Sequence, residues 1–205
     1  VGSEMCIRDR KDRLGFTAMQ NERGELIKII NTSGYWIPYP NVEGYYRLKL
    51  REKINDAKYL SPRASGNHAY ILPAVETTLK NYNPDRPVFF TEGEKKAAKA
   101  TLAGFPALGL SGVWNFKDSD SEFLAELNKF VWKNKIVFIC FDNDIIKKFN
   151  VKQAELRLAV ELMNRGAHVY SIRLPYESEK VGLDDFLVSR GAAAFRELIE
   201  QAKLT

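Results

Sequence analysis

One stretch decides the fold: Ile136-Val137-Phe138-Ile139-Cys140-Phe141-Asp142-Asn143-Asp144. Its apolar run ends in turn-forming residues, which is typical of a strand buried inside a parallel sheet. A second apolar run, Pro87-Val88-Phe89-Phe90, leads in the same way into Thr91-Glu92-Gly93. Ligands and catalytic groups in open α/β sheets gather at the carboxyl ends of such strands. We therefore expect the side chains of Glu92, Asp142 and Asp144 to meet at one edge of the sheet.

The pattern around these runs predicts two regions. From residue 85 to residue 205, strands alternate with helices, which predicts an α/β domain with a parallel sheet and helices on both faces. Residues 11–84 contain short strand patterns and turns, and they are typical of a small antiparallel β-rich segment. The predicted strands lie at 26–30, 35–40, 45–51, 69–72, 107–110, 135–141 and 168–174, and the predicted helices at 94–103, 119–132, 150–165 and 192–202.

The first ten residues, Val1 to Arg10, match a translation of the transposon adapter used in sequencing libraries. We expect this segment to be an artefact and exclude it from fold reasoning, as for a cloning scar. The match also implies a fragment whose true start is missing. Two acids and two arginines cancel within the segment, so the net charge of +5 remains after its removal.

Composition limits the class of protein. The modest basic excess permits a nucleic-acid partner. Outside the first ten residues Cys140 is the only cysteine, which excludes an internal disulfide or a cysteine zinc site and fits a reducing cytoplasm. No apolar run approaches the length of a membrane span. We expect a cytoplasmic protein without a membrane partner.

The acidic residues predict a metal site. Two carboxylates about 4 Å apart repel each other by roughly 4 kcal/mol at an intermediate dielectric, so a bound cation or raised pKa values must hold them together. Oxygen ligands favour a hard ion such as Mg²⁺ or Mn²⁺. Asp184 and Asp185 form a third cluster, in which one acid is available to cap the following short helix while the other faces the metal. For Glu92 the alternative is a solvated loop residue.

Several basic residues are candidates for phosphate contacts. Lys95 and Lys96 lie in the first turn of a predicted helix, where the macrodipole disfavours cations unless an anion lies nearby. Thr91 and Glu94 have the spacing of a capping box at the same helix start. A basic strand face with aromatic neighbours is suited to single-stranded nucleic acid, although it is equally typical of a solvated sheet surface. The remaining candidates are Lys147, Lys148, Arg47, Lys49, Arg51 and Arg63.

Taken together and in this order, four stretches resemble the toprim domains of primases, topoisomerases and related nucleases. They are 91–97, 109–114, 141–144 and 180–187. The closest resemblance is to the toprim-like domain-of-unknown-function 3854 family of plasmid, phage and integrative-element replication proteins, which is related to primase toprim domains. The resemblance spans residues 85–195, and residues 35–72 resemble the β-rich segment that precedes toprim in replicative primases.

The resemblance implies a Rossmann-like fold, a Mg²⁺ or Mn²⁺ ion and catalytic roles for Glu92, Asp142 and Asp144. It extends the metal ligands to Asp184 and Asp185, with Lys180 beside them. Implied partners are DNA or RNA, most readily single-stranded, together with nucleotides and replication proteins or a fused helicase or polymerase domain. One residue departs from the pattern, because Lys95 stands where toprim primases often carry an acid.

Three functions follow as hypotheses. The leading one is metal-dependent phosphoryl transfer on nucleic acid in a mobile-element replication protein, most readily a primase-like step. The second is a catalytically degenerate toprim-like module that only binds nucleic acid, which the departure at Lys95 favours. The third is a phosphatase of the haloacid-dehalogenase type, because Asp142-x-Asp144 after a strand also resembles a phosphorylated-aspartate motif.

Overall fold

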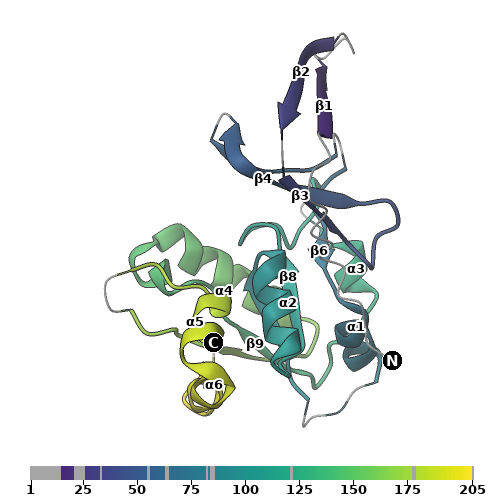
Figure 1. The fold of residues 1–205 in the computed structure, drawn as a ribbon. Helices are drawn as coiled ribbons and strands as arrows, with labels where there is room; N and C mark the ends of the chain where they lie inside the picture. The colour runs from purple at the N-terminus through teal and green to yellow at the C-terminus, as the bar shows by residue number, and fades with distance from the viewer. Residues whose placement is uncertain are drawn as a thin grey trace, which may run out of the picture. The chain divides into compact units, whose positions relative to one another are not determined.

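The structure is a computed structural model of the 205-residue chain, and it describes residues 15–20, 26–32, 34–54, 56–62, 65–81, 83, 86–120, 122–176 and 179–204. The chain forms two compact units, Val1–Ser65 and Gly66–Thr205, which Figure 1 shows in the colours of the chain. The predicted adapter segment, Val1 to Arg10, lies outside the described residues.

The first unit is antiparallel β, as predicted. Strands β1 (Gly15–Gln20) and β2 (Leu26–Thr32) pair as one antiparallel ribbon. Strands β3 (Gly34–Pro38), β4 (Tyr46–Ile54) and β5 (Ala57–Leu60) form a three-stranded sheet in the order β3-β4-β5. Pro38 ends the edge strand β3, where its missing N–H removes no bond from the centre of a sheet. Ile37, Leu48 and Leu50 are buried in this unit.

The second unit contains a six-stranded, mostly parallel sheet, which confirms the predicted α/β class. Its strand order is β11-β10-β9-β7-β8-β6, in which β10, β9, β7 and β8 run parallel and the edge strands β11 and β6 run antiparallel to their neighbours. The strands are β6 (Ala69–Tyr70), β7 (Val88–Glu92), β8 (Ala107–Leu110), β9 (Ile136–Ile139), β10 (His168–Ser171) and β11 (Lys203–Leu204).

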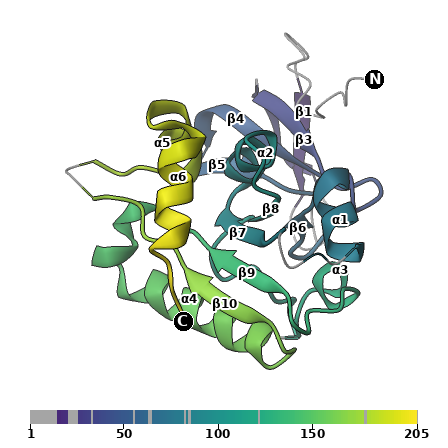
Figure 2. The ribbon, with the colours of Figure 1, turned by 90° about the horizontal axis from the view of Figure 1, so that it is seen from below.

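Helices cover both faces of this sheet. The step from β7 to β8 and the step from β9 to β10 move in opposite directions along the sheet, so right-handed crossovers place their helices on opposite faces. Helix α2 (Glu94–Leu102) packs against α5 (Leu183–Ser189), and α5 packs against α6 (Gly191–Glu200). Helix α4 (Phe149–Met163) packs against β10 behind the sheet in the view of Figure 1. Figure 2 shows the same layers from below.

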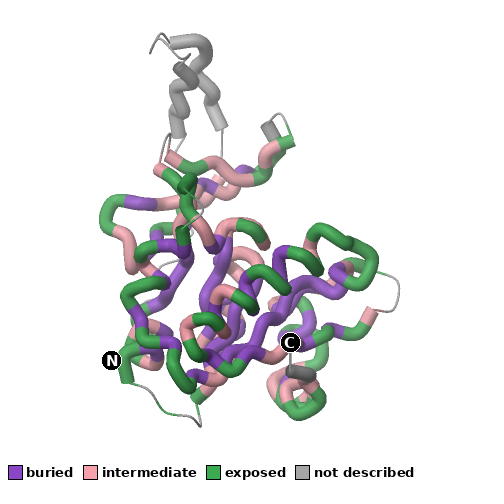
Figure 3. Tube along the Cα trace, turned by 180° about the vertical axis from the view of Figure 1, so that it is seen from behind, coloured by how far each residue is buried: buried purple, intermediate pink, exposed green. Residues whose placement is uncertain are grey.

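The core lies along the central strands, whose trace is almost continuously buried in Figure 3. Every residue of β8 is buried, as are the first four residues of β7 and the last three of β9. Rings from distant segments meet beside them: the Phe89 and Phe138 rings stack with centroids 5.2 Å apart, and the Phe105 and Phe195 rings meet edge to face at 4.8 Å. This burial explains the apolar runs that predict the strands.

Two expectations about element bounds differ from the structure. A helix over 119–132 is wrong, because α3 covers only Ala125–Asn128. The side chain of Asp118 accepts hydrogen bonds from the backbone N–H groups of Asp120 and Glu122, and such local bonds compete with helix formation. The division between the units falls after Ser65, whereas the sequence pattern places it after residue 84. Strand β6 pairs with β8, and helix α1 (Pro73–Lys80) packs on β7, so both belong to the second unit.

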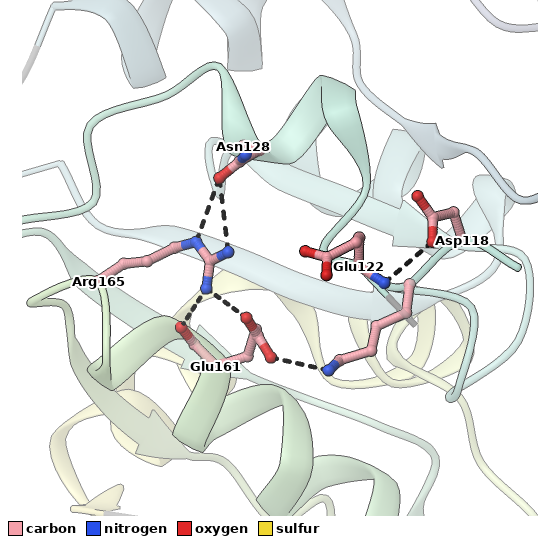
Figure 4. Close-up of polar contacts among 6 residues, drawn as sticks. Asp118, Glu122, Asn128, Glu161 and Arg165 are labelled. Carbon is pink, nitrogen blue, oxygen red and sulfur yellow. Dashed lines mark hydrogen bonds and ion pairs between the residues drawn. The ribbon is translucent and has the colours of Figure 1, made fainter. Parts of the chain in front are cut away.

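A polar cluster joins the end of α4 to the segment around α3 (Figure 4). Arg165 contacts both the side chain and the backbone carbonyl of Glu161, and its guanidinium also reaches Asn128 at 3.4 Å. Lys117 pairs with the second oxygen of Glu161 at 3.0 Å. Burial alone would raise the pKa of the Glu161 carboxyl, but Lys117 and Arg165 outweigh it and hold that pKa below its usual value. Within the described residues, no helix is both long and apolar enough to cross a membrane.

Candidate active site at the carboxyl edge of the sheet

The carboxyl ends of β7 and β9 lie side by side. Phe90 is opposite Ile139 in the parallel ladder, and the N–H of Cys140 donates to the carbonyl of Phe90 at 2.9 Å. The chain therefore leaves both strands at the same edge, with Glu92 at the end of one and Asp142 just beyond the other. Gly93 then turns the chain into α2 with φ of +90°, a conformation that favours glycine.

Asp142 is buried between two lysines. Only 2% of the residue is exposed. Lys96 Nζ, from the first turn of α2, lies 2.6 Å from Oδ1, and Lys180 Nζ, from the segment before α5, lies 2.8 Å from Oδ2. Both contacts are ion pairs. The sequence predicts an anion near the lysines at the start of α2. For Lys96, the carboxylate of Asp142 is this anion.

Asp144 lies in the 3-10 helix η1 (Asn143–Lys147) and extends the same charge network. Its Oδ2 is 2.7 Å from Lys148 Nζ and 3.6 Å from Lys180 Nζ. Burial alone would raise the pKa of Asp144, but the two lysines outweigh it and hold that pKa below its usual value. Burial likewise opposes the charge of Lys180, yet Asp142, Asp144 and Glu92 raise its pKa above the usual value. Glu92 is therefore within electrostatic reach of the cluster.

The two acids of the third cluster have separate positions. Gly182 is the N-cap residue of α5, and its N–H donates to Oδ2 of Asp185 at 3.2 Å, so Asp185 rather than Asp184 ties off the helix start. Oδ1 of Asp184 is buried and has no hydrogen-bond partner among the described residues. The expectation that one of the two acids caps the helix is confirmed, with Asp185 in that role. That the other acid faces a metal ion stays a prediction.

Gly182 allows these groups to approach each other. A Cβ atom at this position would lie 2.5 Å from Lys96 Cε, 2.8 Å from Asp184 Oδ1 and 3.2 Å from Asp142 Oδ1. The first two distances are shorter than van der Waals contact allows, so a larger residue here would force the ends of the Lys96 and Asp184 side chains to move. The φ of −91° does not itself favour glycine. Because residue 182 has no side chain, charged groups from α2, η1 and α5 can lie close together.

Asn143 fixes the segment that carries Lys180, a role that sequence reasoning missed. Its Nδ2 donates to the carbonyls of Pro175 and Glu179 at 2.9 and 3.0 Å, and its Oδ1 accepts the N–H of Val181 at 2.8 Å. The residue is 1% exposed. Its position between Asp142 and Asp144 suggests only a turn, because the partners lie more than 30 residues further along the chain.

The donor set of this site suits a hard cation, because every acidic side chain offers only oxygen. The buried carboxylate oxygens of Asp142 and Oδ1 of Asp184 are candidate ligands. Within the described residues, however, no three His, Cys, Asp or Glu side chains group closely enough to hold a metal ion. Lysine ammonium groups neutralise Asp142 and Asp144 instead, so an incoming ion has to displace at least one of them.

The other predicted contacts at this edge are distributed around the network. Lys147 Nζ donates to the hydroxyl of Tyr176 at 2.6 Å and lies 4.3 Å from the centroid of its ring. Lys95 is half-buried in the first turn of α2. The prediction of a capping box at Thr91 and Glu94 is wrong, because the N-cap residue of α2 is Gly93 and no side chain caps the helix by a hydrogen bond.

The basic face predicted on β4 is present in the first unit. Arg47 and Lys49 both approach the Tyr59 ring, with 4.6 and 5.9 Å to its centroid, and Arg51 is exposed further along the strand. Three aromatic residues precede β4 and are the sequence neighbours of this basic face. Tyr39 and Tyr45 are buried, and Trp36 is exposed. Arg63 lies outside the described residues.

Trp114 is an exposed aromatic ring in the loop that follows the carboxyl end of β8. The residue is 46% exposed, and β8 is the direct neighbour of β7 in the sheet. The loop that carries Trp114 therefore begins at the edge of the sheet where Glu92 ends β7. Sequence reasoning used this tryptophan only as part of a family motif, although a large exposed aromatic beside a charged edge is itself a signal for stacking.

A family model described as a domain of unknown function, DUF3854, matches residues 79–194. An uncharacterized protein of Picosynechococcus sp. (strain ATCC 27264 / PCC 7002 / PR-6) is 26% identical over 133 residues, which are 59% of this chain and 13% of that protein. The chain thus spans a small part of the length of this relative.

Solved structures with a similar fold are primase domains. The DnaG primase catalytic domain bound to single-stranded DNA matches with a TM-score of 0.60 and 19% identity, covering 91% of this chain and 58% of that one. The RNA polymerase domain of Mycobacterium tuberculosis primase DnaG matches with a TM-score of 0.57 and 14% identity, covering 91% of this chain and 60% of that one. The zinc-binding and RNA polymerase domains of the Aquifex aeolicus primase match with a TM-score of 0.54 and 17% identity, covering 93% of this chain and 40% of that one. At these identities the likeness shows the fold.

Proposed function

Because the chain belongs to the DUF3854 family, and its fold is that of primase catalytic domains, we propose that it performs metal-dependent phosphoryl transfer on nucleic acid. The most specific form of the proposal is a primase-like step in a mobile-element replication protein. One observation carries it: Asp142 and Asp144 lie at the carboxyl edge of the sheet among three lysines that can exchange a carboxylate for a phosphate.

The proposed ion is Mg²⁺ or Mn²⁺, held by Asp142 and Asp144 with Glu92 and Asp184 as further ligands. Such an ion polarises a phosphate and stabilises the leaving oxygen. Asp185 contributes indirectly by fixing the start of α5, beside Asp184.

The lysines perform the binding and orientation. Lys96 and Lys180 neutralise Asp142 in the structure. If Asp142 held the metal ion, both ammonium groups would be available to bind phosphate oxygens. Lys148 is similarly placed on Asp144. Fixed positive charges of this kind stabilise charge that develops on a transferring phosphoryl group.

We propose DNA or RNA, single-stranded at the point of contact, as the partner. The exposed rings of Trp114 and Trp36 offer stacking surfaces, and Arg47, Lys49 and Arg51 offer backbone contacts in the first unit. The further partners in this proposal are nucleotides as the second substrate, and replication proteins or a fused helicase or polymerase domain.

A second candidate function is nucleic-acid binding without catalysis. It is favoured by the ion pairs that neutralise Asp142 and Asp144, and by the lack of a grouped set of three metal-ligating side chains among the described residues. In this alternative the lysine–aspartate pairs are permanent and stabilise the edge of the sheet.

The test measures primer synthesis on a single-stranded template with labelled nucleotides and Mg²⁺ or Mn²⁺, alongside oligonucleotide binding by fluorescence anisotropy. The Asp142→Asn, Asp144→Asn double variant is compared with the wild type and with Asp120→Asn, an exposed acid remote from the site. Loss of synthesis with retained binding supports catalysis. Absence of synthesis in the wild type, with equal binding by all three, supports the binding module. A phosphoaspartate trapped at Asp142 points to the phosphatase alternative.

A further inference from the structure

A cavity lies at the edge of the sheet opposite to the one that carries Asp142. Its volume is about 480 Å³, and it is lined by residues from α1, from the start of β7, from the turn between α2 and β8, and from α6. Figure 2 shows α1 and α6 on either side of these strands. We call it the amino-edge pocket, because β7 and β8 begin there, whereas Asp142 lies beyond their carboxyl ends. Its volume is in the range of small-molecule sites, roughly 300–1,000 Å³.

The pocket has an apolar floor and a basic rim. The Phe89 and Phe105 rings, 5.7 Å apart and nearly perpendicular, form part of the floor. Arg86 and Arg196 line it and are both exposed. The guanidinium carbon of Arg196 lies 5.6 Å from the centroid of Phe105, so the ring helps to fix the direction of this side chain.

The charge of the pocket is positive. No acidic residue lines it among the described residues, and neither arginine forms an ion pair with a described acid. The carboxyl ends of α1 and α2 are nearby, represented in the lining by Thr78 and Gly104. Each helix end contributes about −0.5 charge, so the two helices offset only about one of the two arginine charges. A net charge of about +1 remains and is exposed to solvent, with no counter-ion from the residues that the structure describes.

We propose that the amino-edge pocket binds a small organic anion that joins an apolar body to one phosphate or carboxylate group. The arginines bind the anionic group through paired N–H donors, and the phenylalanine floor accepts the apolar body. This site is separate from the acidic edge and does not depend on the proposed catalytic function, because no lining residue belongs to the lysine–aspartate network.

The test is a titration of the full chain followed by amide NMR shifts, with the Gly104 amide as the reporter in the pocket. Phenyl phosphate and benzoate combine an apolar ring with the two candidate anionic groups, and the tighter of the two identifies the preferred group. Inorganic phosphate supplies charge alone, and phenol supplies the ring alone. We expect saturable shifts with phenyl phosphate or benzoate, and affinities about tenfold weaker for the two partial probes, because each makes only part of the contacts.

Two variants locate the binding. Arg196→Gln and Arg86→Gln should each weaken the better probe about tenfold, the effect of losing one charge-assisted pair of hydrogen bonds. Arg157→Gln, an exposed arginine on α4, is the matched control and should bind as the wild type does. If Arg196→Gln lowers thermal stability, Arg196→Lys keeps the charge without the paired donors and should give an intermediate affinity. Shifts that do not saturate, equal affinity in Arg196→Gln, or equal binding of inorganic phosphate would overturn the proposal.

Discussion

Replacing Lys96 by Met tests whether the ion pair with Asp142 holds the edge of the sheet together. Met keeps most of the length of the side chain and removes only the charge. At 2.6 Å and an effective dielectric of about 20, the gross attraction is roughly 6 kcal/mol, most of which is offset by desolvation of the two charges. A buried acid that loses its only partner costs about 3–5 kcal/mol. Asp142 retains Lys180, so we expect Lys96→Met to cost about 2 kcal/mol.

Lys180→Met provides the internal comparison. Its contact with Asp142 is almost as short, 2.8 Å, but its side chain is 55% exposed whereas that of Lys96 is 19% exposed. Solvent screening therefore limits the loss to about 1 kcal/mol or less. In a chain of this size, 1 kcal/mol corresponds to about 2–4 °C in melting temperature. Lys96→Met should lower the melting temperature by about 4–8 °C, and Lys180→Met by less than half of that.

The assay is thermal unfolding by circular dichroism with and without about 5–10 mM Mg²⁺, because an ion that binds only the folded state raises its stability by mass action. If Asp142 is a metal ligand, the ion replaces the missing lysine charge and restores part of the lost stability of Lys96→Met. Lys99→Met, on the same helix, is the matched control and should melt as the wild type does. A melting temperature unchanged by Lys96→Met would refute the ion-pair argument. A deficit that Mg²⁺ does not change would remove the support for a metal ligand at Asp142 while leaving the ion pair intact.

Three further changes test other parts of the structure. Gly182→Ala should push Lys96 away from Asp142, and the double variant with Lys96→Met should cost less than the two single losses combined, as measured by denaturant unfolding. Glu161→Gln should cost about 1 kcal/mol at pH 7. Because the folded pKa of Glu161 lies below its usual value of 4.5, this cost should shrink as pH falls below about 4.5, and a pH-independent difference would contradict it. On the proposed function, Trp114→Ala should weaken binding of a single-stranded oligonucleotide at least about fivefold, the lower end for one stacked base, without a change in melting temperature.

Much of the second unit could be predicted because burial determines its sequence. β7, β8 and β9 are short and almost wholly buried, so each appears as an uninterrupted apolar run between turn residues. α3 could not be predicted in the same way. The residues before it have the spacing of a capping box, but Asp118 binds two backbone N–H groups of its own loop. Hydrogen-bonding side chains near a helix start support a turn or a helix equally well.

The sequence could predict at which edge of the sheet the acids of the candidate site lie. It could not predict which lysines those acids contact. Two neighbouring parallel strands that both end in acids must place those acids at one edge, which follows from the register of Phe90 and Ile139. The pairing of Asp142 with Lys96 and Lys180 depends instead on how α2 and α5 approach the sheet. That approach is set by the bare backbone of Gly182 and by the hydrogen bonds of Asn143, neither of which has a local sequence signal.

The balance of charge at the carboxyl edge links metal and phosphate binding. Four acids, Glu92, Asp142, Asp144 and Asp184, lie near three lysines, Lys96, Lys148 and Lys180, which leaves one net negative charge. In this state the edge repels a nucleic-acid backbone. On the proposed function, a divalent ion bound there would reverse the sign to one net positive charge, and the lysines beside Asp142 would then be available to phosphate oxygens. The replacement of lysine by the ion at Asp142 would then favour the binding of ion and phosphate together. Each ligand would raise the affinity for the other by an equal factor. Lysines already paired with acids are consequently no obstacle to a metal-dependent function, because they hold the edge together until ion and phosphate arrive.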